Sequence, residues 1–243
     1  MRMVTFARRT AAEILRDPLN LFFGLGFPLV LLMMLTAIQA NIPVALFTLP
    51  SLAPAVAAFG ASFMTLFSAN LIARDRETAF LQRLYTTPLT SADYLLGYTL
   101  PLLPMALAQS AVCYIAAMVL GLPATVNILF ALAGSIPVGL FFIALGLLCG
   151  SVFNVKQVGG LCGALLTNLT AFLSGAWFDL KLVGGVFERI ANVLPFVHAV
   201  ELERALLRGE WAAAAPHFAW VAAYGLAALA AGMALFIHQM KRV

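Results

Sequence analysis

Charge is scarce in this sequence. Only 10% of the 243 residues are Asp, Glu, Lys or Arg, whereas 63% are hydrophobic. Soluble domains carry about 25% charged residues, so the composition excludes an ordinary soluble protein. It predicts an integral membrane protein that forms a single transmembrane domain over residues 1–243. The basic residues that give the net charge of +4 are dispersed along the chain, which gives no indication of nucleic-acid binding.

Cysteine is also rare, and its distribution argues against disulfide or metal chemistry. The number of cysteines is odd and no C-x-x-C motif occurs. All three lie within apolar runs: Cys113, Cys149 and Cys162. We interpret them as small buried hydrophobic residues. A second candidate for a metal site consists of His198, Glu201 and Glu203. Their spacing is not that of a zinc-enzyme helix, and no second histidine is near in the sequence. We therefore expect no metal site.

Four long runs contain no Asp, Glu, Lys or Arg. They cover residues 18–73, 94–155, 157–178 and 211–240, which are 56, 62, 22 and 30 residues long. A helix needs about 20 residues to cross a bilayer, so the first two runs can each hold two spans. The sequence therefore predicts an all-α integral membrane protein with six transmembrane helices. The predicted spans cover about residues 19–38, 52–73, 94–120, 127–153, 158–178 and 217–238.

The distribution of Lys and Arg predicts the orientation of these spans. With six spans both termini lie on the same side of the membrane, and that side would hold ten of the 14 basic residues. The other four lie with five acids in the loop from Asp179 to Glu210. We therefore expect a multi-pass protein of a bacterial inner or plasma membrane, with both termini and the loop that begins at Arg74 in the cytoplasm.

The first 17 residues are amphipathic and precede the first run. Apolar residues such as Val4 and Ile14 fall on one helical face, and charged residues such as Arg9 and Arg16 fall on the other. A helix of this kind lies in the interface plane of a membrane. Residues 1–17 are therefore predicted to form an interfacial helix, which also fits a simpler role as a positively charged anchor.

The chain lacks the features that would let it drive transport alone. Ion-coupled carriers usually keep an acid or base inside a span, and the interiors of the predicted spans contain none. A P-loop requires a lysine that follows a glycine, and none of Lys156, Lys181 and Lys241 does so. If the protein moves a substrate, another chain must supply the energy.

A charged segment between Arg74 and Tyr98 interrupts the apolar runs. A segment of this composition cannot lie in hydrocarbon, so it forms a loop at a membrane face. Glu77 to Leu84 is expected to form a short helix that Pro88 terminates. From charge alone, the segment could be a solvated loop that only sets topology.

The order of residues in this loop is more specific than its charge. Asp75-Arg76-Glu77 precedes Leu81 and Leu84, and Thr87-Pro88-Leu89 precedes Leu95-Leu96-Gly97. This order resembles the cytoplasmic loop of permease subunits of type-2 ATP-binding-cassette (ABC-2) exporters, which is the coupling helix that touches the ATPase. The resemblance implies a coupling role for seven residues: Asp75, Arg76, Glu77, Phe80, Leu81, Leu84 and Pro88. The sequence departs from the family pattern at Ala79-Phe80 and Gln82.

The segment before the last predicted span resembles the same family. Ser174-Gly175, Phe178, Leu194-Pro195 and His198-Ala199 follow its order, although Asp179 stands where the family commonly has proline. In the family this segment forms an outer re-entrant helical hairpin that gates the exit, and here it is expected to form two short helices around Leu194-Pro195. The residues implied for the outer gate are Phe178, Leu194, Pro195 and His198.

Polar residues recur at helical spacing on two of the predicted spans. They could line a translocation path or form hydrogen bonds between helices. The candidates for the path are Ser62, Thr65, Thr167, Asn168, Thr170 and Ser174.

The resemblance and the composition together predict the permease subunit of an ATP-driven exporter. Two permease chains, identical or homologous, would enclose a path for a hydrophobic or amphipathic molecule such as a drug, a lipid or a peptide-like compound. We expect no catalysis and no cofactor in this chain, with ATP and Mg²⁺ bound by a partner ATPase. The alternative is a non-transporting membrane protein, either a membrane-embedded enzyme or an assembly scaffold.

Overall fold

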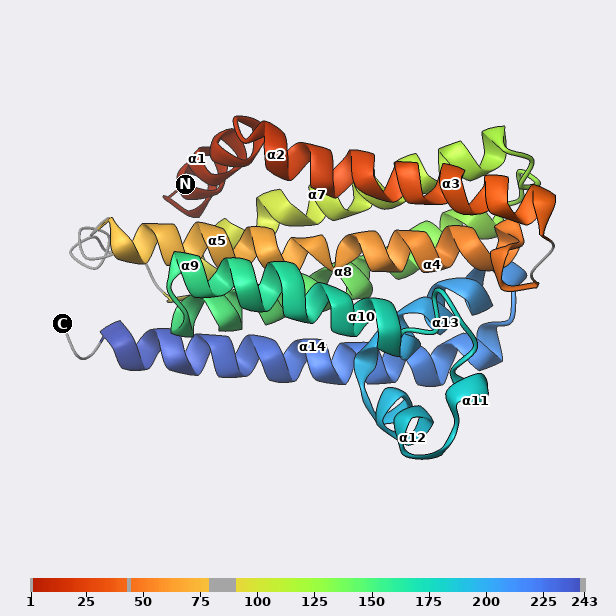
Figure 1. Cartoon of the computed structure of the whole chain (residues 1–243). Coiled ribbons are helices and arrows are strands. Elements are labelled where there is room, and N and C mark those ends of the chain that lie inside the picture. Colours follow the sequence, from red (N-terminus) through yellow and green to blue (C-terminus); the bar gives the residue numbers. More distant parts are fainter. Residues whose placement is uncertain (1, 43–44, 79–90, 241–243) are drawn as a thin grey trace.

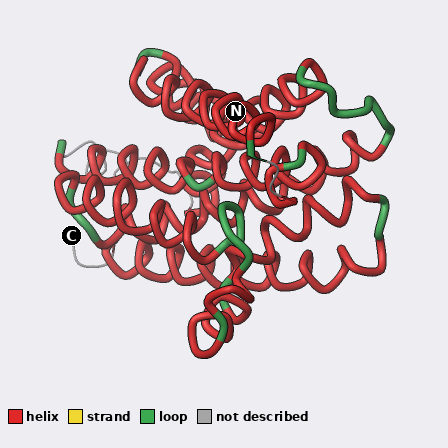
Figure 2. The backbone as a smooth tube through the Cα atoms, turned by 45° about the vertical axis from the view of Figure 1, so that its right-hand side comes forward, coloured by secondary structure: helices red, strands yellow, loops and turns green. Residues whose placement is uncertain are grey.

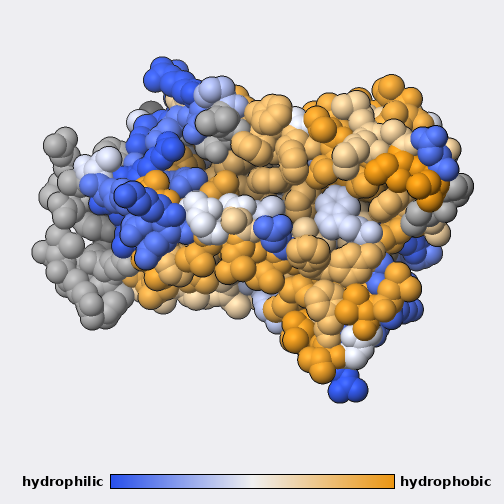
Figure 3. All heavy atoms as spheres, viewed as in Figure 1, coloured by the Kyte–Doolittle hydropathy of each residue, from blue (hydrophilic) through white to orange (hydrophobic). Residues whose placement is uncertain are grey.

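The computed structural model describes residues 2–42, 45–78 and 91–240 of the chain. Within these residues all regular structure is helical, and the long helices run side by side in one bundle (Figures 1 and 2). The prediction of an all-α protein is confirmed. Hydrophilic residues gather at the end of the bundle that carries the N-terminus, whereas most of the rest of the visible face is hydrophobic (Figure 3).

The first half of the chain contains the helices at the top of Figure 1 and the helix that runs through the bundle centre. These elements are α1 (Arg2–Leu15), α2 (Pro18–Leu21), the π-helix η1 (Phe22–Gly26), α3 (Phe27–Asn41), the 3₁₀ helix η2 (Ala45–Phe47), α4 (Leu49–Ala61), α5 (Phe63–Glu77) and α7 (Ser91–Val119).

The second half begins with a long helix, continues through shorter ones and ends with another long helix. These elements are α8 (Asn127–Val152), α9 (Val155–Val158), the π-helix η3 (Gly159–Leu166), α10 (Thr167–Leu173), α11 (Leu180–Val183), α12 (Gly185–Val193), α13 (Pro195–Arg208) and α14 (Trp211–Met240).

Five helical stretches of the described residues are long and apolar enough to cross a membrane. They are Phe22–Asn41, Leu49–Glu77, Asp93–Val119, Asn127–Val152 and Trp211–Leu235. Each overlaps one of the six predicted spans, because most of each lies within a run without charge. The chain is therefore a multi-pass membrane protein.

The span predicted over residues 158–178 is not among these five stretches. Three consecutive helical pieces, α9, η3 and α10, cover Val155 to Leu173, and the helix ends before Gly175, which has a φ of 67°. Lys156 and Asn168 lower the apolar character of this stretch. Its helical pieces lie beside α5 (Figure 1). The count of six spans is not confirmed.

Two glycines let α8 approach α5 closely. A Cβ atom on Gly146 would overlap the Ser68 hydroxyl and the main chain of Thr65, and one on Gly150 would lie 2.6 Å from the carbonyl oxygen of Ala69. The Thr65 hydroxyl donates to the carbonyl of Phe142 at 3.0 Å. These two glycines, four positions apart, form a small-residue motif that contributes to close helix packing.

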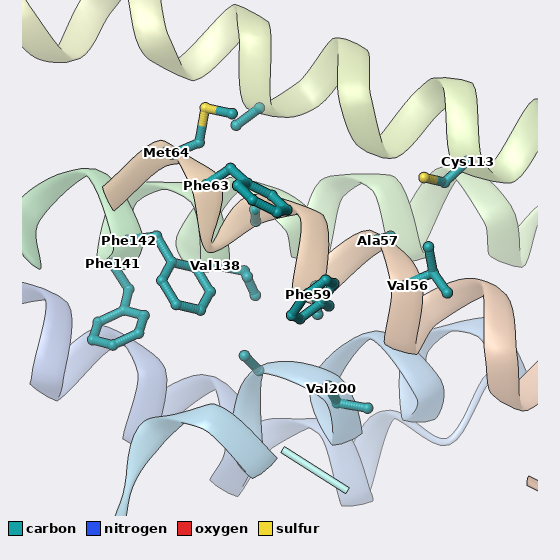
Figure 4. Close-up of a cluster of buried hydrophobic side chains, with 14 of the residues drawn as sticks. Val56, Ala57, Phe59, Phe63, Met64, Cys113, Val138, Phe141, Phe142 and Val200 are labelled. Carbon is teal, nitrogen blue, oxygen red and sulfur yellow. The ribbon is translucent and has the colours of Figure 1, made fainter. Parts of the chain in front are cut away.

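A cluster of aromatic and aliphatic side chains fills the centre of the bundle (Figure 4). Phe59 of α4 and Phe63 of α5 pack edge to face with ring centroids 5.8 Å apart. Val138 and Phe142 contribute from α8, and Val200 contributes from α13 (Figure 4). Because it combines side chains from α4, α5, α8 and α13, this cluster holds the short helix α13 against the long helices.

The short helices α11 and α12 project sideways from the bundle, below α14 in Figure 1. Gly184 and Gly185, with φ of 62° and 59°, form the turn between them. The predicted two helices around Leu194-Pro195 are confirmed, since α12 ends at Val193 and α13 begins at Pro195. A re-entrant path of this segment through the membrane stays a prediction.

Candidate coupling cluster and outer gate

Asp75 occupies the centre of a polar cluster at the end of α5. Its side chain is only 3% exposed. The guanidinium of Arg9, on α1, donates one hydrogen bond to each carboxylate oxygen, at 2.7 and 2.8 Å. The hydroxyl of Tyr98, on α7, donates to Oδ2 at 2.7 Å. This one carboxylate therefore joins three helices, and its hydrogen bond is the main reason why the pKa of Arg9 is raised above its ordinary value.

Arg76 binds the end of α8 instead. Its Nη1 donates to the carbonyl oxygens of Gly150, at 2.8 Å, and Phe153, at 3.4 Å. Carbonyls in the last turn of a helix have no partner within the helix, and the helix dipole makes that end attractive to a cation. Arg76 therefore closes the end of α8 and fixes it to α5.

Glu77 completes the sequence of contacts. Its Oε1 accepts a hydrogen bond from the backbone N–H of Val155 at 3.0 Å, at the first turn of α9. Carboxylates are favoured at helix N-termini, where backbone N–H groups lack partners. Asp75, Arg76 and Glu77, which we call the acid–Arg–Glu triplet, therefore bind four other elements: α1, α7, α8 and α9.

The triplet leads directly into the segment that the sequence identifies as the coupling loop. Four of the predicted coupling residues, Phe80, Leu81, Leu84 and Pro88, lie outside the described residues. The predictions about these four, and about the short helix from Glu77 to Leu84, therefore stay predictions.

Sequence reasoning did not identify Arg9 and Tyr98 as partners of Asp75. The sequence predicts Arg9 on the polar face of an interfacial helix and Tyr98 in a span. Phe6 is the residue that relates the two helices, because its ring packs edge to face on Tyr98 with centroids 5.0 Å apart. An amphipathic helix that buries Phe6 against α7 also brings Arg9 to the end of α5.

The six candidates for the path differ in their hydrogen bonds. Thr65 is buried and bonds across to α8. Three candidates on α10 donate to carbonyls of the preceding π-helix η3: Thr167 to Cys162, Asn168 to Ala164 and Thr170 to Leu166.

Burial separates these candidates further. Ser62, Thr170 and Ser174 are buried inside this chain, whereas Asn168 is exposed. Thr65 therefore acts in helix packing, whereas a neighbouring chain or a substrate could reach the exposed Asn168 and, in part, the half-buried Thr167. The role of the set as a path wall stays a prediction.

The candidate outer-gate residues lie where α12, α13 and α14 meet. Nδ1 of His198 lies 2.8 Å from Nδ1 of His217, and its Nε2 lies 2.9 Å from the carbonyl oxygen of Asn192. The His198 ring also stacks on Trp220, with centroids 5.0 Å apart and planes at 6°. No second histidine is near His198 in the sequence, but α14 brings His217 beside it in the fold.

The other gate candidates pack around these helices. Leu194 and Pro195 form the junction between α12 and α13. Phe178 lies between two aromatic rings, with centroid distances of 6.4 Å to Phe172 and 6.3 Å to Phe187. The part of the chain that the structure describes contains no group of three His, Cys, Asp or Glu residues that could hold a metal ion.

Arg204 fastens α13 to the bundle. It is 4% exposed, and it donates to the carbonyl oxygens of Ser51, at 3.1 Å, and Gly175, at 3.2 Å. It also binds the Glu201 carboxylate at 2.7 Å. Beside it lies a polar cavity of about 330 Å³, lined among others by Asp179 and Glu188. These contacts join α13 to the first turn of α4 and to the turn after α10.

Comparison with known proteins agrees with this arrangement. Residues 45–234 match the family model described as ABC-2 family transporter protein. The chain is 27% identical over 229 residues to Nodulation protein J of Bradyrhizobium diazoefficiens, covering 94% of this chain and 86% of that protein. It is 25% identical over 190 residues to Nodulation protein J of Sinorhizobium fredii, covering 78% of this chain and 71% of that protein.

Proposed function

Because this chain belongs to the ABC-2 family of transporter proteins, we propose that it is the permease subunit of an exporter driven by ATP. A family match over residues 45–234 accounts for most of the helices that could cross a membrane. The chain has no P-loop lysine, so a separate ATPase would bind ATP and Mg²⁺ and hydrolyse the nucleotide.

The single observation that carries the coupling part of the proposal is the contact set of the acid–Arg–Glu triplet. Asp75 binds α1 and α7, Arg76 binds α8, and Glu77 binds α9. A force applied to the loop after Glu77 would therefore act on all of these helices together. This is the mechanical property that a coupling loop needs.

The ATPase would dock on the apolar residues of that loop. Exposed ion pairs contribute at most about 1 kcal/mol each, so Phe80, Leu81 and Leu84 would supply most of the binding free energy, with Pro88 limiting the loop. The acid–Arg–Glu triplet would then transmit movement rather than provide affinity.

Orientation and assembly follow from the same proposal. Both termini and the coupling loop would face the cytoplasm of a bacterial cell, since most basic residues lie there. The stretch over α9, η3 and α10 would serve as a sixth crossing. Two such chains, identical or homologous, would enclose the path between them.

The substrate would be hydrophobic or amphipathic. The helices expose apolar residues along most of their length, and the polar candidates on them are few and uncharged. Asn168 would face the path, and Phe178, Leu194, Pro195 and His198 would close its outer end.

Affinity purification of the chain from its own host in mild detergent tests the assignment. We expect a P-loop ATPase to co-purify in a near-equal ratio, and we expect its hydrolysis rate to change when both are reconstituted in liposomes. A chain that purifies without any ATPase and leaves added family ATPases unbound would favour the alternative, a non-transporting scaffold or enzyme.

A further inference from the structure

Glu203 is an acid placed deep inside the helical bundle. It lies on α13 and is 0% exposed. Its Cγ lies 3.9 Å from the position of a Cβ on Gly134, so α13 and α8 are close at this point. The interiors of the spans contain no charge in the sequence, but the structure brings this carboxyl between two of them from a neighbouring helix.

Two hydroxyl groups meet the carboxyl. Tyr114, on α7, donates to Oε2 at 2.8 Å. Ser135, on α8, donates to Oε1 at 3.0 Å. The carboxyl of Glu203 therefore links α13 to two long membrane helices, and each of its oxygens has a partner.

The groups packed around this carboxyl include no cation bonded to it. Arg204 follows it in the chain but binds Ser51, Gly175 and Glu201. On α7 the titratable neighbours are Cys113 and Tyr114.

The remaining helices that contact α13 also leave the carboxyl without a counter-charge. The sequence of α4, Leu49–Ala61, has no titratable residue, and α10, Thr167–Leu173, has none. On α14, His217 is bonded to His198. On α12, Glu188 lines the polar cavity, and Arg189 is exposed. On α8, the titratable residue is Cys149, near its far end.

Burial without a counter-charge favours the neutral acid. An ionised carboxylate removed from water costs several kcal/mol unless it is paired. Burial accordingly raises the pKa of Glu203 to about 8, against the opposing effect of the hydrogen bonds from Tyr114 and Ser135. At neutral pH the seated carboxyl therefore carries a proton.

The hydrogen-bond partners of Glu203 can accommodate both its protonated and its ionised form. The Ser135 Oγ lies 3.4 Å from the carbonyl oxygen of Ala131, one turn earlier on α8. When Glu203 is protonated, its Oε1 can donate to Ser135, and Ser135 can turn its own hydrogen to Ala131. When Glu203 is ionised, Ser135 and Tyr114 both donate to it. Hydrogen bonds are satisfied in both states, so the site can gain and lose a proton without leaving a buried polar atom unpaired.

We propose that Glu203 is a proton-binding site whose occupancy holds α13 against α7 and α8, and that the proton passes to water when α13 moves away. The proton site rests on the burial and contacts of Glu203, and only its consequence for an outer gate rests on the proposed function. Export would then be restrained by acid outside the cell and released as the outside becomes more alkaline.

The direction of the effect follows from proton linkage. While α13 packs against α7 and α8, Glu203 binds its proton up to about pH 8, whereas a hydrated glutamate releases it above its ordinary pKa of 4.5. Between these two limits the packed state holds a proton that the displaced state does not. The equilibrium constant for displacement of α13 from α7 and α8 should therefore rise about tenfold for each pH unit across that window, and it should be constant above and below it.

Infrared difference spectroscopy of the purified chain in nanodiscs tests the proton site directly. Between about pH 6 and about pH 10, the wild type should lose the carbonyl stretch of one buried carboxylic acid, with a midpoint near 8. Glu203→Gln should lack this band, and Glu210→Gln, which removes an exposed acid, should keep it. Absence of the band in the wild type, or its persistence in Glu203→Gln, would overturn the proposal.

Two further measurements keep the test decisive if Glu203→Gln does not fold. Tyr114→Phe removes a donor to the carboxylate, so the midpoint of the band should move to higher pH, and an unchanged midpoint would contradict the site. Amide hydrogen exchange of α13, corrected for its intrinsic pH dependence, should increase about 100-fold between about pH 5.5 and about pH 7.5 in the wild type. A pH-independent exchange would refute the link to α13. None of these measurements needs an ATPase or a substrate, so their failure leaves the proposed function untouched.

Discussion

Arg9 and Asp75 are separated by 66 positions in the chain and form a two-pronged ion pair, with N–O distances of 2.7 and 2.8 Å. The carboxylate is buried, whereas the Arg9 side chain is 37% exposed. This pair connects the amphipathic first helix to the end of a membrane helix, directly before the predicted coupling loop.

Arg9→Met should lower stability because, among the described residues, it leaves the buried Asp75 carboxylate with Tyr98 as its remaining side-chain partner. Hydrogen bonds to charged groups contribute roughly 1.5–3 kcal/mol each, and partial exposure of Arg9 reduces this, so we expect a loss of about 1–3 kcal/mol. Thermal unfolding in detergent measures it. Arg8→Met, at the exposed neighbouring position, is the control, and equal losses in both variants would contradict the assignment.

Arg9→Met and Tyr98→Phe should not be additive, because both side chains bind the same carboxylate. Residues that share one partner commonly show interaction energies of about 0.5–3 kcal/mol. A double-mutant cycle on the melting temperature measures this value. The cycle of Arg8→Met with Tyr98→Phe should give zero, and a zero value for the first cycle as well would show that the two contacts to Asp75 are independent.

Gly146→Ala should destabilise the protein, because the added methyl group would overlap Ser68 and the main chain of Thr65. Overpacking of a close-packed interface costs about 1–3 kcal/mol. Gly160→Ala is the matched control, since no atom lies within 4 Å of its added methyl group. The comparison of melting temperatures decides the matter, and a stabilised Gly146→Ala would disprove the close approach of α5 and α8.

Leu84→Asp should abolish most of the binding of the partner ATPase, whereas Leu84→Met should preserve it. Asp75→Asn should reduce binding less and disturb the link between hydrolysis and transport more, since it weakens the contacts of α5 with α1 and α7. Pull-down of the ATPase, with hydrolysis and transport measured in parallel, separates the two effects. Full binding and full transport by a correctly inserted Leu84→Asp would reduce the loop to a determinant of topology.

Single-cysteine labelling in a background without Cys113, Cys149 and Cys162 tests the orientation. An impermeant maleimide should label Lys181→Cys in intact cells and should label Arg83→Cys only after lysis. The physical reason is the concentration of basic residues on the side of Arg83. Labelling of Arg83→Cys from outside would reverse the proposed topology.

The helices were predictable because uncharged runs and their interruptions are local properties of the sequence. The run over residues 18–73 holds two helical stretches, Phe22–Asn41 and the larger part of Leu49–Glu77, as its length predicts. The stretch over residues 158–178 is uncharged and long enough to cross a membrane. Its polar residues and the end of its helix at Leu173 explain why it is not among the helices that are long and apolar enough to do so.

The partners of the predicted residues could not be found in the same way, because they lie far away in the chain. Asp75 was identified by a local motif, but the positions of Arg9 and Tyr98 depend on how α1 packs on α7. The burial of Glu203 could not be predicted for the same reason. Glu203 lies outside every uncharged run, and its burial arises only when α13 packs between long helices.

The contacts of the acid–Arg–Glu triplet also restrict how this region can change over generations. Each of its three side chains binds different elements, and the single side chain of Asp75 has partners on both α1 and α7. An exchange of charge between positions 9 and 75 would restore the ion pair but would place a guanidinium against Tyr98 in a buried site. A change at Asp75 therefore affects partners on two helices at once, and lineages that lose it should also show changes at positions 9 and 98.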